Sequence, residues 1–344
     1  MPRTALITGI SGQDGAYLAK FLLEQGYRVI GGLRSLSQSG IARLQELQVA
    51  REVEFAELDL AQSADISRVL EKVKPDEIYN LAGQSSVALS FEQPIYTAQI
   101  NGVGPLRLLK ATRQLAPEAR FYQASTSEMF GGAPTTPQNE TTPFHPRSPY
   151  GFAKLLGHWA AVNYRESYGL RASSGISFNH ESPLRGRDFV TRKITLSLAR
   201  IRHGELDVLE LGNLDAQRDW GFAGDYVKGM WQMLQQPEAQ DFVLATGEGR
   251  TVRSFVETAA ARFGLAIEWS GSGASEQGID RRTGKAIVRV NSAFYRPAEV
   301  EALVGNPEKA QLILGWRRTI GFEELVTMMT EADDKRIRDG SLLL

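Results

Sequence analysis

Apolar and polar positions along the first half of the chain follow two alternating patterns. Short apolar or β-branched runs are each followed by a stretch in which apolar residues return every three or four positions, as Tyr17, Leu18, Phe21 and Leu22 do. This alternation is typical of a parallel sheet covered by helices on both faces. It predicts a Rossmann-type doubly wound α/β sheet with strands over 4–8, 28–33, 53–60, 77–81, 121–124 and 173–178.

The pattern becomes less regular after residue 178. We expect a helix over 226–234, a strand over 242–245 and a helix from Thr251, and the glycine- and serine-rich stretch 271–278 interrupts this part. We therefore expect a dinucleotide-binding Rossmann domain over 1–178, to which a segment of about 213–247 returns. Residues 179–344 are expected to form mainly a smaller, mixed α/β substrate lobe.

A glycine turn follows the first expected strand. Gly9, Gly12 and Gly15 are spaced G-x-x-G-x-x-G and precede the first amphipathic helix. Glycines in such a turn let a pyrophosphate approach the helix N-terminus, whose free amides and dipole attract anions. A purely structural turn is the alternative, but its position in a strand, turn and helix unit favours a dinucleotide site.

Ser148 and Pro149 indicate the start of another helix, because serine caps free amides and proline suits the first helical position. Tyr150 and Lys154 then share one helix face, where the ammonium can stand beside the phenol oxygen. A nearby cation favours the phenolate, which can act as a base. Two ordinary surface residues would fit the same spacing.

Hydroxyl and carboxylate groups follow the expected strand 121–124. Ser125, Thr126, Ser127 and Glu128 stand at its carboxyl end, where open α/β sheets bind ligands. With Tyr150 downstream, we interpret this cluster as a site of proton and hydride transfer in which Glu128 is a further base. A helix cap or a salt bridge is the alternative role for Glu128.

Arg34 and Ser35 end the second expected strand, where an NAD enzyme usually carries an acidic residue for the ribose 2′-hydroxyl. An arginine and a serine suit a 2′-phosphate, so we predict NADP as the cofactor. Arg43 is a second candidate for this phosphate, and Asp59 is a candidate acceptor for the adenine amino group. Solvated surface arginines are the alternative.

Later segments offer further candidate contacts. Small residues over 82–85 let the backbone lie along the cofactor, and Tyr96 and Asn101 are either cofactor contacts or packing residues. The polar loop 179–186 follows the sixth strand and is expected to meet cofactor and substrate. Dispersed cations suit a diphosphate better than a nucleic acid; they are Arg192, Lys193, Arg218, Arg281, Arg282, Arg289 and Arg296.

Composition narrows the class of protein. The 344 residues, 42% of them apolar, suffice for two lobes, and a net charge of −1 gives no overall attraction to nucleic acid or to anionic membranes. The chain has no cysteine, which excludes disulfides and thiolate metal sites, and its four histidines lack the spacing of metal ligands. With neither a signal sequence nor an apolar run of ~20 residues, we expect a cytoplasmic protein.

Eight dispersed stretches resemble the GDP-mannose 4,6-dehydratases of the extended short-chain dehydrogenase/reductase superfamily, over nearly the whole chain. The stretches are T-G-I-S-G-Q-D-G, F-Y-Q-A-S-T-S-E-M-F-G, R-S-P-Y-G-F-A-K, N-Y-R-E-S-Y-G, F-N-H-E-S-P-L-R-G, F-V-T-R-K-I-T, L-G-N-L-D-A-Q-R-D-W-G and Y-R-P-A-E-V-E. Two departures are visible. The segment L-R-S-L over 33–36 replaces the usual double arginine with serines, and Leu184 stands where a second arginine is common.

The resemblance implies roles for residues at matching positions. Those matching the family's catalytic residues are Thr126, Glu128, Tyr150 and Lys154. Besides this tyrosine and lysine, the expected cofactor contacts are Gly9, Ser11, Gly12, Gln13, Asp14, Gly15, Arg34, Asp59, Leu60, Leu81, Ala82, Gly83, Ser85, Tyr96, His180 and Arg185. With Arg281 added from the dispersed cations, the expected substrate contacts are Ser85, Glu128, Asn179, Lys193, Leu211, Gly212, Asn213, Arg218, Arg281, Arg296 and Glu299.

The implied activity is that of a hydro-lyase in deoxyhexose biosynthesis. It converts GDP-D-mannose into GDP-4-keto-6-deoxy-D-mannose by internal hydride transfer through tightly bound NADP, in a homodimer or homotetramer. Guanine as the base rests on the resemblance alone. One alternative is an NADPH-dependent reductase of the ketosugar, which needs no base at Glu128. Another is a non-catalytic NADP-sensing protein, which would tolerate the loss of Tyr150, Lys154 and Glu128.

Overall fold

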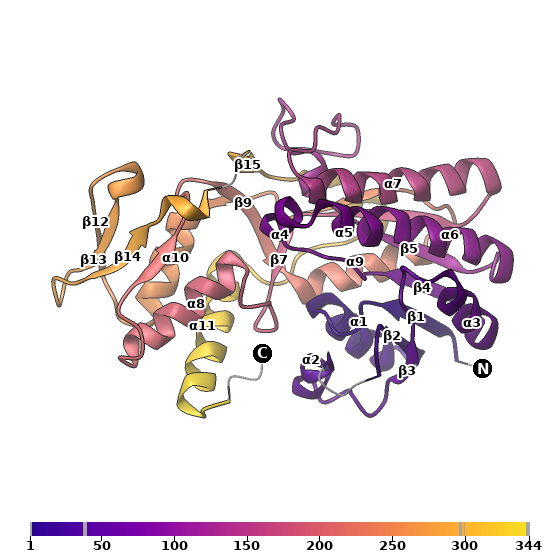
Figure 1. Ribbon diagram of the computed structural model, residues 1–344, viewed down its shortest axis with the longest axis horizontal. Helices are drawn as coiled ribbons and strands as arrows, with labels where there is room; N and C mark the ends of the chain where they lie inside the picture. The colour runs from indigo at the N-terminus through magenta and orange to yellow at the C-terminus, as the bar shows by residue number, and fades with distance from the viewer. Residues whose placement is uncertain (1, 37–39, 296–297, 299, 342–344) are drawn as a thin grey trace.

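A computed structural model describes residues 2–36, 40–295, 298 and 300–341. Within these residues, a parallel seven-stranded sheet runs in the order β10, β6, β5, β4, β1, β2, β3 (Figure 1). The bounds are β1 (Thr4–Thr8), β2 (Arg28–Leu33), β3 (Glu54–Glu57), β4 (Glu77–Asn80), β5 (Arg120–Thr126), β6 (Ala172–Ser177) and β10 (Phe242–Leu244). Strand order reverses between β1 and β4, the point at which such sheets bind ligands.

Helices cover both faces of this sheet. Because successive strand residues point to opposite faces, Ala5 and Ile7 of β1 pack in one apolar cluster and Leu6 packs in another. The first cluster includes α1 (Gln13–Glu24) and α9 (Ala223–Gln235). The second includes α3 (Ser63–Val73), α6 (Gly104–Leu115) and α7 (Pro149–Tyr168). The doubly wound Rossmann-type fold that the sequence predicted is confirmed.

Shorter helices lie between these elements. They are α2 (Ala42–Glu46), α4 (Val87–Glu92) and α5 (Pro94–Ala98), and α5 runs into the π-helical turn η2 (Gln99–Val103) before α6. Within the described residues, no helix combines the length and the apolar content needed to cross a bilayer.

The carboxyl-terminal lobe has its own core. Apolar residues of α8 (Val190–Arg202), α10 (Val252–Arg262) and α11 (Phe322–Arg338) pack together with a second sheet. That sheet runs in the order β12 (Ile267–Ser270), β13 (Gln277–Asp280), β14 (Ala286–Val290), β8 (Leu209–Leu211). Figure 1 shows this lobe beside the Rossmann domain, with the β12–β14 strands at its outer end.

A third sheet lies between the two regions in Figure 1. Its strands are β7 (Asn179–Glu181), β9 (Gln217–Phe222), β11 (Gly249–Thr251) and β15 (Ala302–Leu303), with β9 paired to the other three. Between β9 and β11 the chain re-enters the Rossmann domain, where α9 packs on α1 and β10 extends the large sheet beside β6.

Several element bounds differ from the expectations. Strand β3 ends at Glu57, three residues before the expected strand 53–60 does. Strand β5 runs to Thr126, two residues beyond the expected strand 121–124, because its parallel pairing with β6 continues as far as Ser177. Helix α8 and the β12–β14 sheet were not predicted. The glycine- and serine-rich stretch 271–278, expected to interrupt this part, includes a short 3-10 turn, η4 (Gly273–Ser275), and the first residues of β13, which pair with the neighbouring strands β12 and β14.

Candidate active site

Tyr150 and Lys154 come from the first two turns of α7, whose local signals act as the sequence indicated. Ser148 Oγ accepts a 3.0 Å hydrogen bond from a first-turn amide, and Pro149 is the first helical residue. Gly169 follows the helix with a φ of 69°, a conformation that favours glycine. Both side chains are nearly buried, with 8% of Tyr150 and 7% of Lys154 exposed.

Thr126 and Glu128 approach Tyr150 from the end of β5. Thr126 is the last residue of the strand, and its hydroxyl and the Glu128 carboxylate both act on the Tyr150 hydroxyl, in opposite directions. Glu128 lies in the 3-10 turn η3 (Ser127–Met129) and is 9% exposed. The structure thus gathers the four expected catalytic residues at the carboxyl end of β5.

Burial sets the charge state of the two central groups. It raises the pKa of Tyr150 to about 12, a rise that Thr126 opposes and Glu128 increases, and it lowers the pKa of Lys154 to about 8. The hydrogen bond of Lys154 Nζ goes to the carbonyl oxygen of Ala124 at 2.8 Å, and Nζ lies 6.0 Å from the centre of the Tyr150 ring. The ammonium is thus held by a backbone oxygen on the side of the Tyr150 ring, and its expected place beside the phenol oxygen stays a prediction.

A buried chain of side chains holds the acceptor of Lys154. Gln123 Nε2 also donates to the carbonyl oxygen of Ala124, at 3.2 Å, and Gln123 Oε1 accepts from Asn80 Nδ2 at 2.9 Å. Asn80 Oδ1 accepts from Thr8 Oγ1 at 2.8 Å, so the chain crosses β1, β4 and β5. Sequence reasoning missed these residues. The available signal was a polar residue inside an otherwise apolar strand, as in E-I-Y-N and F-Y-Q.

The glycine turn shows close backbone packing and an open helix end. Gly9 has a φ of 70°, and a Cβ there would lie 2.7 Å from the amide nitrogen of Ala82. A Cβ at Gly15 would lie 2.4 Å from the carbonyl oxygen of Gly9. Helix α1 begins after Gly12 without a side-chain cap, so its first amides can meet the oxygens of a pyrophosphate. The turn fits a dinucleotide.

Asp14 and His180 join the first turn of α1 to β7. His180 Nε2 lies 2.8 Å from Asp14 Oδ2, Nδ1 donates to the carbonyl oxygen of Phe178 at 2.7 Å, and the ring stacks on Tyr226. Burial opposes both charges, yet the pair lowers the pKa of Asp14 to about 2 and raises the pKa of His180. Gln13 adds a 3.0 Å hydrogen bond to the carbonyl oxygen of His180.

The expected adenosine-side contacts occupy separate turns after β2 and β3. Arg34 Nη1 donates to the Tyr96 hydroxyl at 3.0 Å, so these two expected cofactor residues touch. Asp59 Oδ1 accepts a 2.9 Å bond from the amide of Ala61, and Leu60 is buried.

The segment Leu81–Ser85 follows β4 and is held by Asn101. Asn101 Oδ1 accepts a 2.9 Å bond from the amide of Gln84, and its Nδ2 donates 2.7 Å to the carbonyl oxygen of the same residue. The side chain comes from the π-helical turn η2, a distortion often found at functional sites. Ser85 is exposed beside this turn. The Asn101 side chain is therefore bonded to the backbone of residues 81–85, the segment expected to lie along the cofactor.

Several expected substrate residues lie at the start of β7, in the first turn of α8 and at the end of β8. Asn179 Oδ1 is buried without a hydrogen-bond partner among the described residues, as suits a ligand contact. Lys193 Nζ lies 3.6 Å above the ring of Phe294, and a Cβ at Gly212 would lie 2.8 Å from the Phe294 carbonyl oxygen. Phe294, which sequence reasoning missed, thus joins α8 to the turn of Leu211, Gly212 and Asn213.

Two more cations approach this region. Arg218 is 6% exposed and donates to the carbonyl oxygen of Val300 at 2.9 Å. Arg185 Nε lies 3.0 Å from Glu181 Oε2, its guanidinium stacks 3.7 Å from the Phe189 ring, and its charge acts on Tyr150.

Arg281 does not join this group. It follows β13, at the end of β14 opposite to the one that lies beside Leu211, and its exposed guanidinium pairs with Glu268 at 3.3 Å. The sequence could not show that the hairpin directs it away from the other expected substrate residues. Arg296 and Glu299, also expected substrate contacts, lie outside the described residues.

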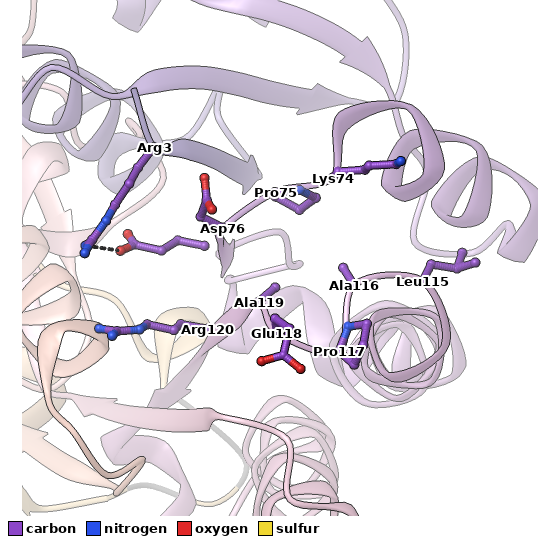
Figure 2. Close-up of a pocket in the computed structure, with 11 residues that line it drawn as sticks. Arg3, Lys74, Pro75, Asp76, Leu115, Ala116, Pro117, Glu118, Ala119 and Arg120 are labelled. Carbon is purple, nitrogen blue, oxygen red and sulfur yellow. Dashed lines mark ion pairs between the residues drawn. The ribbon is translucent and has the colours of Figure 1, made fainter. Parts of the chain in front are cut away.

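A cavity of about 410 Å³ opens at the opposite, amino-terminal edge of the large sheet (Figure 2). Its lining includes Arg3, Lys74, Asp76, Glu118 and Arg120, and Figure 2 marks an ion pair between Arg3 and Glu77. Because β5 carries Thr126 at its other end, this cavity is separate from the candidate active site.

The glycine turn at the switch point of a parallel Rossmann-type sheet, with Tyr150 and Lys154 on the helix that follows β5, defines an extended short-chain dehydrogenase/reductase. The family model described as GDP-mannose 4,6 dehydratase matches residues 6–329. The chain belongs to the GDP-mannose 4,6-dehydratase family.

Individual relatives agree with this assignment. The chain is 50% identical to a GDP-mannose 4,6-dehydratase of Sinorhizobium fredii, covering 98% of both chains, and 49% identical to the Homo sapiens GDP-mannose 4,6 dehydratase, covering 97% of this chain and 92% of that one. Among solved structures, it resembles Thermus thermophilus UDP-glucose 4-epimerase in complex with NAD (TM-score 0.79, 26% identity, 96% and 98% coverage). A Streptomyces venezuelae dTDP-glucose 4,6-dehydratase with NAD bound shares the fold (TM-score 0.83, 21% identity, 99% and 100% coverage).

Proposed function

We propose that the protein is a hydro-lyase that converts GDP-D-mannose into GDP-4-keto-6-deoxy-D-mannose. One observation carries this proposal: Tyr150, Lys154, Thr126 and the buried carboxylate of Glu128 gather at the carboxyl end of β5. Membership of the GDP-mannose 4,6-dehydratase family over residues 6–329 supports the choice of substrate. The product is of the kind from which deoxyhexoses are made, and we place the reaction in the cytoplasm.

Each of these residues has a distinct task in the proposed reaction. Tyr150 takes the proton of the hydroxyl on carbon 4 as that carbon becomes a ketone. The ketone acidifies carbon 5, so Glu128 removes the carbon 5 proton while the carbon 6 hydroxyl leaves as water, with Glu128 or Thr126 supplying the proton that this hydroxyl needs. When bound, NADP would supply the hydride acceptor for carbon 4 and the hydride donor for carbon 6, so the reaction uses no external reductant. The proton that Tyr150 took from the carbon 4 hydroxyl then goes to carbon 5, which restores the phenolate.

The high pKa of Tyr150 means that its phenolate must be stabilised before it can act as a base near pH 7. Lowering it from about 12 to about 7 requires roughly 7 kcal/mol of differential stabilisation. Lys154, Arg185 and a positively charged nicotinamide are cations suited to this task. Lys154 is held by Ala124, so it can keep one position near the tyrosine ring throughout the reaction.

We propose NADP as the nicotinamide cofactor. The uncapped N-terminus of α1 suits the pyrophosphate, and Arg34, held by the hydroxyl of Tyr96, suits the 2′-phosphate. Arg34→Glu is expected to raise the dissociation constant of NADP by about a hundredfold and that of NAD far less, since a carboxylate repels the phosphate and accepts from a ribose hydroxyl. Equal losses for both cofactors would contradict the choice of NADP.

Glu128 favours dehydration over simple ketosugar reduction, because a reductase needs no carboxylate at this place. The test is to incubate the protein with GDP-mannose and catalytic NADP, without reductant. We expect a product lighter by one water and no net change in nicotinamide absorbance. No product in this assay, with NADPH consumed in proportion to product when the 4-keto-6-deoxy sugar nucleotide and NADPH are supplied instead, would favour the reductase, and binding of NADP without any product in either assay would favour a sensing protein.

We also propose a homodimer built on α7. Phe152, Leu156 and Trp159 lie on one face of this helix at helical spacing, and they are 50%, 46% and 53% exposed. Ile95 and Leu106 of the adjacent α5 and α6 are exposed as well. A second copy of the chain would cover these apolar side chains.

Light scattering after size exclusion tests this arrangement. Trp159→Glu should convert the dimer into a monomer, whereas Leu312→Glu, which changes a still more exposed leucine on the turn η6 (Ala310–Leu314), should not. A wild-type protein that elutes as a monomer at micromolar concentration would contradict the proposal.

A further inference from the structure

Three consecutive carbonyl groups after β7 are each held by an arginine. Arg192 Nη1 donates to the carbonyl oxygens of Pro183 at 2.9 Å and Arg185 at 2.8 Å. Arg43 Nε donates to the carbonyl oxygen of Leu184, between them, at 2.7 Å. Arg192 belongs to α8 of the carboxyl-terminal lobe and Arg43 belongs to α2 of the Rossmann domain, so the two lobes hold the same segment.

The same segment is tied to the glycine turn. Arg43 Nη1 donates to the carbonyl oxygen of Ser11 at 3.1 Å, so one guanidinium joins this turn to Leu184. Ser182 Oγ donates to Gln13 Oε1 at 2.7 Å and accepts from the amide of Leu184 at 3.1 Å. A movement of Ser182–Arg185 would therefore disturb the residues expected to surround the pyrophosphate.

Ion pairs close these contacts into a ring. The guanidinium of Arg192 pairs with Asp333 of α11 at 2.7 Å, and neither side chain is exposed. Arg336 Nη1 donates to Asp333 Oδ1 at 3.0 Å, and Arg336 Nη2 pairs with Glu46 of α2. Glu46 follows Arg43 by three residues on the same helix. Leaving the buried Arg192 or Asp333 without its partner is strongly destabilising, so the ring resists opening at that pair.

We propose that Arg43 and Arg192 are positioning residues that fix Ser182–Arg185 and, through it, the guanidinium of Arg185. The inference rests on the proposed function and on the expected role of Arg185 as a cofactor contact. Arg185 itself is oriented by Glu181 and by stacking on Phe189, so its remaining freedom is that of the backbone which Arg43 and Arg192 hold. Because the ring spans both lobes, loosening it weakens cofactor and substrate binding together.

Arg43→Gln is the informative variant, because Arg43 is partly exposed and its removal leaves the core ion pair of Arg192 intact. We expect it to raise the dissociation constant of NADP and the KM for GDP-mannose about tenfold each, with kcat at saturation changed by less than about threefold. Arg43→Lys keeps the charge and one donor without the fork geometry, so it should recover part of both losses. A merely structural role would lower the folded fraction without raising KM per folded site.

Two further variants complete the experiment. Arg68→Gln is the matched control: this arginine of the same domain also donates to a backbone carbonyl, that of Glu57, and to a carboxylate, but lies outside the ring, so both constants should stay unchanged. Glu46→Gln opens the ring at a partly exposed side chain and should raise both constants about threefold or more. It replaces Arg43→Gln if that variant does not fold.

Unchanged constants in Arg43→Gln, or in Glu46→Gln where it serves as the replacement, would overturn the inference. The outcome is separate from that of the proposed function. If the wild-type protein makes no ketosugar from GDP-mannose, the proposed function fails. Titration of the same variants with NADP, followed by tryptophan fluorescence, still decides whether Arg43 positions the segment.

Discussion

Lys154 Nζ and the carbonyl oxygen of Ala124 are joined by a 2.8 Å hydrogen bond, so β5 carries both Thr126 and the acceptor that holds the ammonium. The charge of Lys154 is thus placed for catalysis and does not stabilise the fold. Burial lowers its pKa to about 8, which means that the folded protein holds this charge at a cost.

Lys154→Met should therefore lose activity without losing stability. Removing the cation beside Tyr150 is expected to reduce kcat by about 10² to 10⁴. The midpoint of thermal unfolding should stay the same or rise, because an unfavourable buried charge is gone. Lys20→Met, at an exposed lysine paired with Glu24, should change neither quantity. A variant with normal turnover would remove Lys154 from the mechanism.

Glu128→Gln tests the second base. The amide keeps the size of the side chain but cannot take the carbon 5 proton, so ketosugar formation should fall about 10²- to 10³-fold. Oxidation at carbon 4 depends on Tyr150 and should persist, which would appear as reduced nicotinamide accumulating in a single turnover. Rapid-mixing absorbance measurements with GDP-mannose check this. Ketosugar production at the wild-type rate would show that another group removes the proton.

Gly15→Ala tests the packing of the glycine turn. Its Cβ would lie 2.4 Å from the carbonyl oxygen of Gly9 and 2.6 Å from Ile10 Cα, so α1 must move away from the turn. We expect a loss of about 1 to 3 kcal/mol of stability and a clear rise in the dissociation constant of NADP. Gly321→Ala is the matched control, since a Cβ there meets nothing within 4 Å. Urea denaturation and cofactor titration give both quantities.

His180→Gln should change how stability depends on pH. The pKa of His180 is raised in the folded protein. Its contribution to the free energy of unfolding is therefore complete below the unfolded pKa of about 6.5 and is lost as pH rises through the folded pKa. The pKa of Asp14 is lowered to about 2. Its contribution to the free energy of unfolding, roughly 2 kcal/mol, is therefore present above about pH 4 and is lost as pH falls through about 2.

Urea denaturation at about pH 5.5 and about pH 9 measures this dependence. The variant should be most destabilised at the lower pH and should approach the wild-type stability at the higher one. His145→Gln, at an exposed histidine, is the control. Equal destabilisation at both pH values would contradict the ion pair between His180 and Asp14.

Local signals explain what could be predicted from the sequence. Ser148 and Pro149 define the start of α7 through contacts within one turn. Glycine is required at position 9 by its positive φ and by the close backbone of Ala82, in a turn whose place the repeating βαβ pattern predicts. The apolar and polar periodicity was sufficient for the large sheet, because β1, β2, β4 and β5 each place residues in both apolar clusters, one on each face of the sheet.

Contacts between distant segments explain the rest. No periodicity indicates that Arg43 bonds to Leu184, or that Phe294 lies beside Lys193, since each pair joins parts of the chain more than 100 positions apart. The acceptor of Lys154 was missed for a related reason: Ala124 has no side-chain polarity, and only the backbone geometry shows its carbonyl turned toward α7. The direction of the β13–β14 hairpin, which carries Arg281 away, depends on pairing with β8 and β12.

The late arrival of β10 affects how the molecule folds as it is synthesised. When α7 and β6 have left the ribosome, β6 is still a free strand edge, and the apolar surface that α9 covers is still open to water. Unpaired edges recruit other chains. Residues 223–244 must therefore emerge and dock before the edge of β6 and this apolar surface of the nascent Rossmann domain are covered.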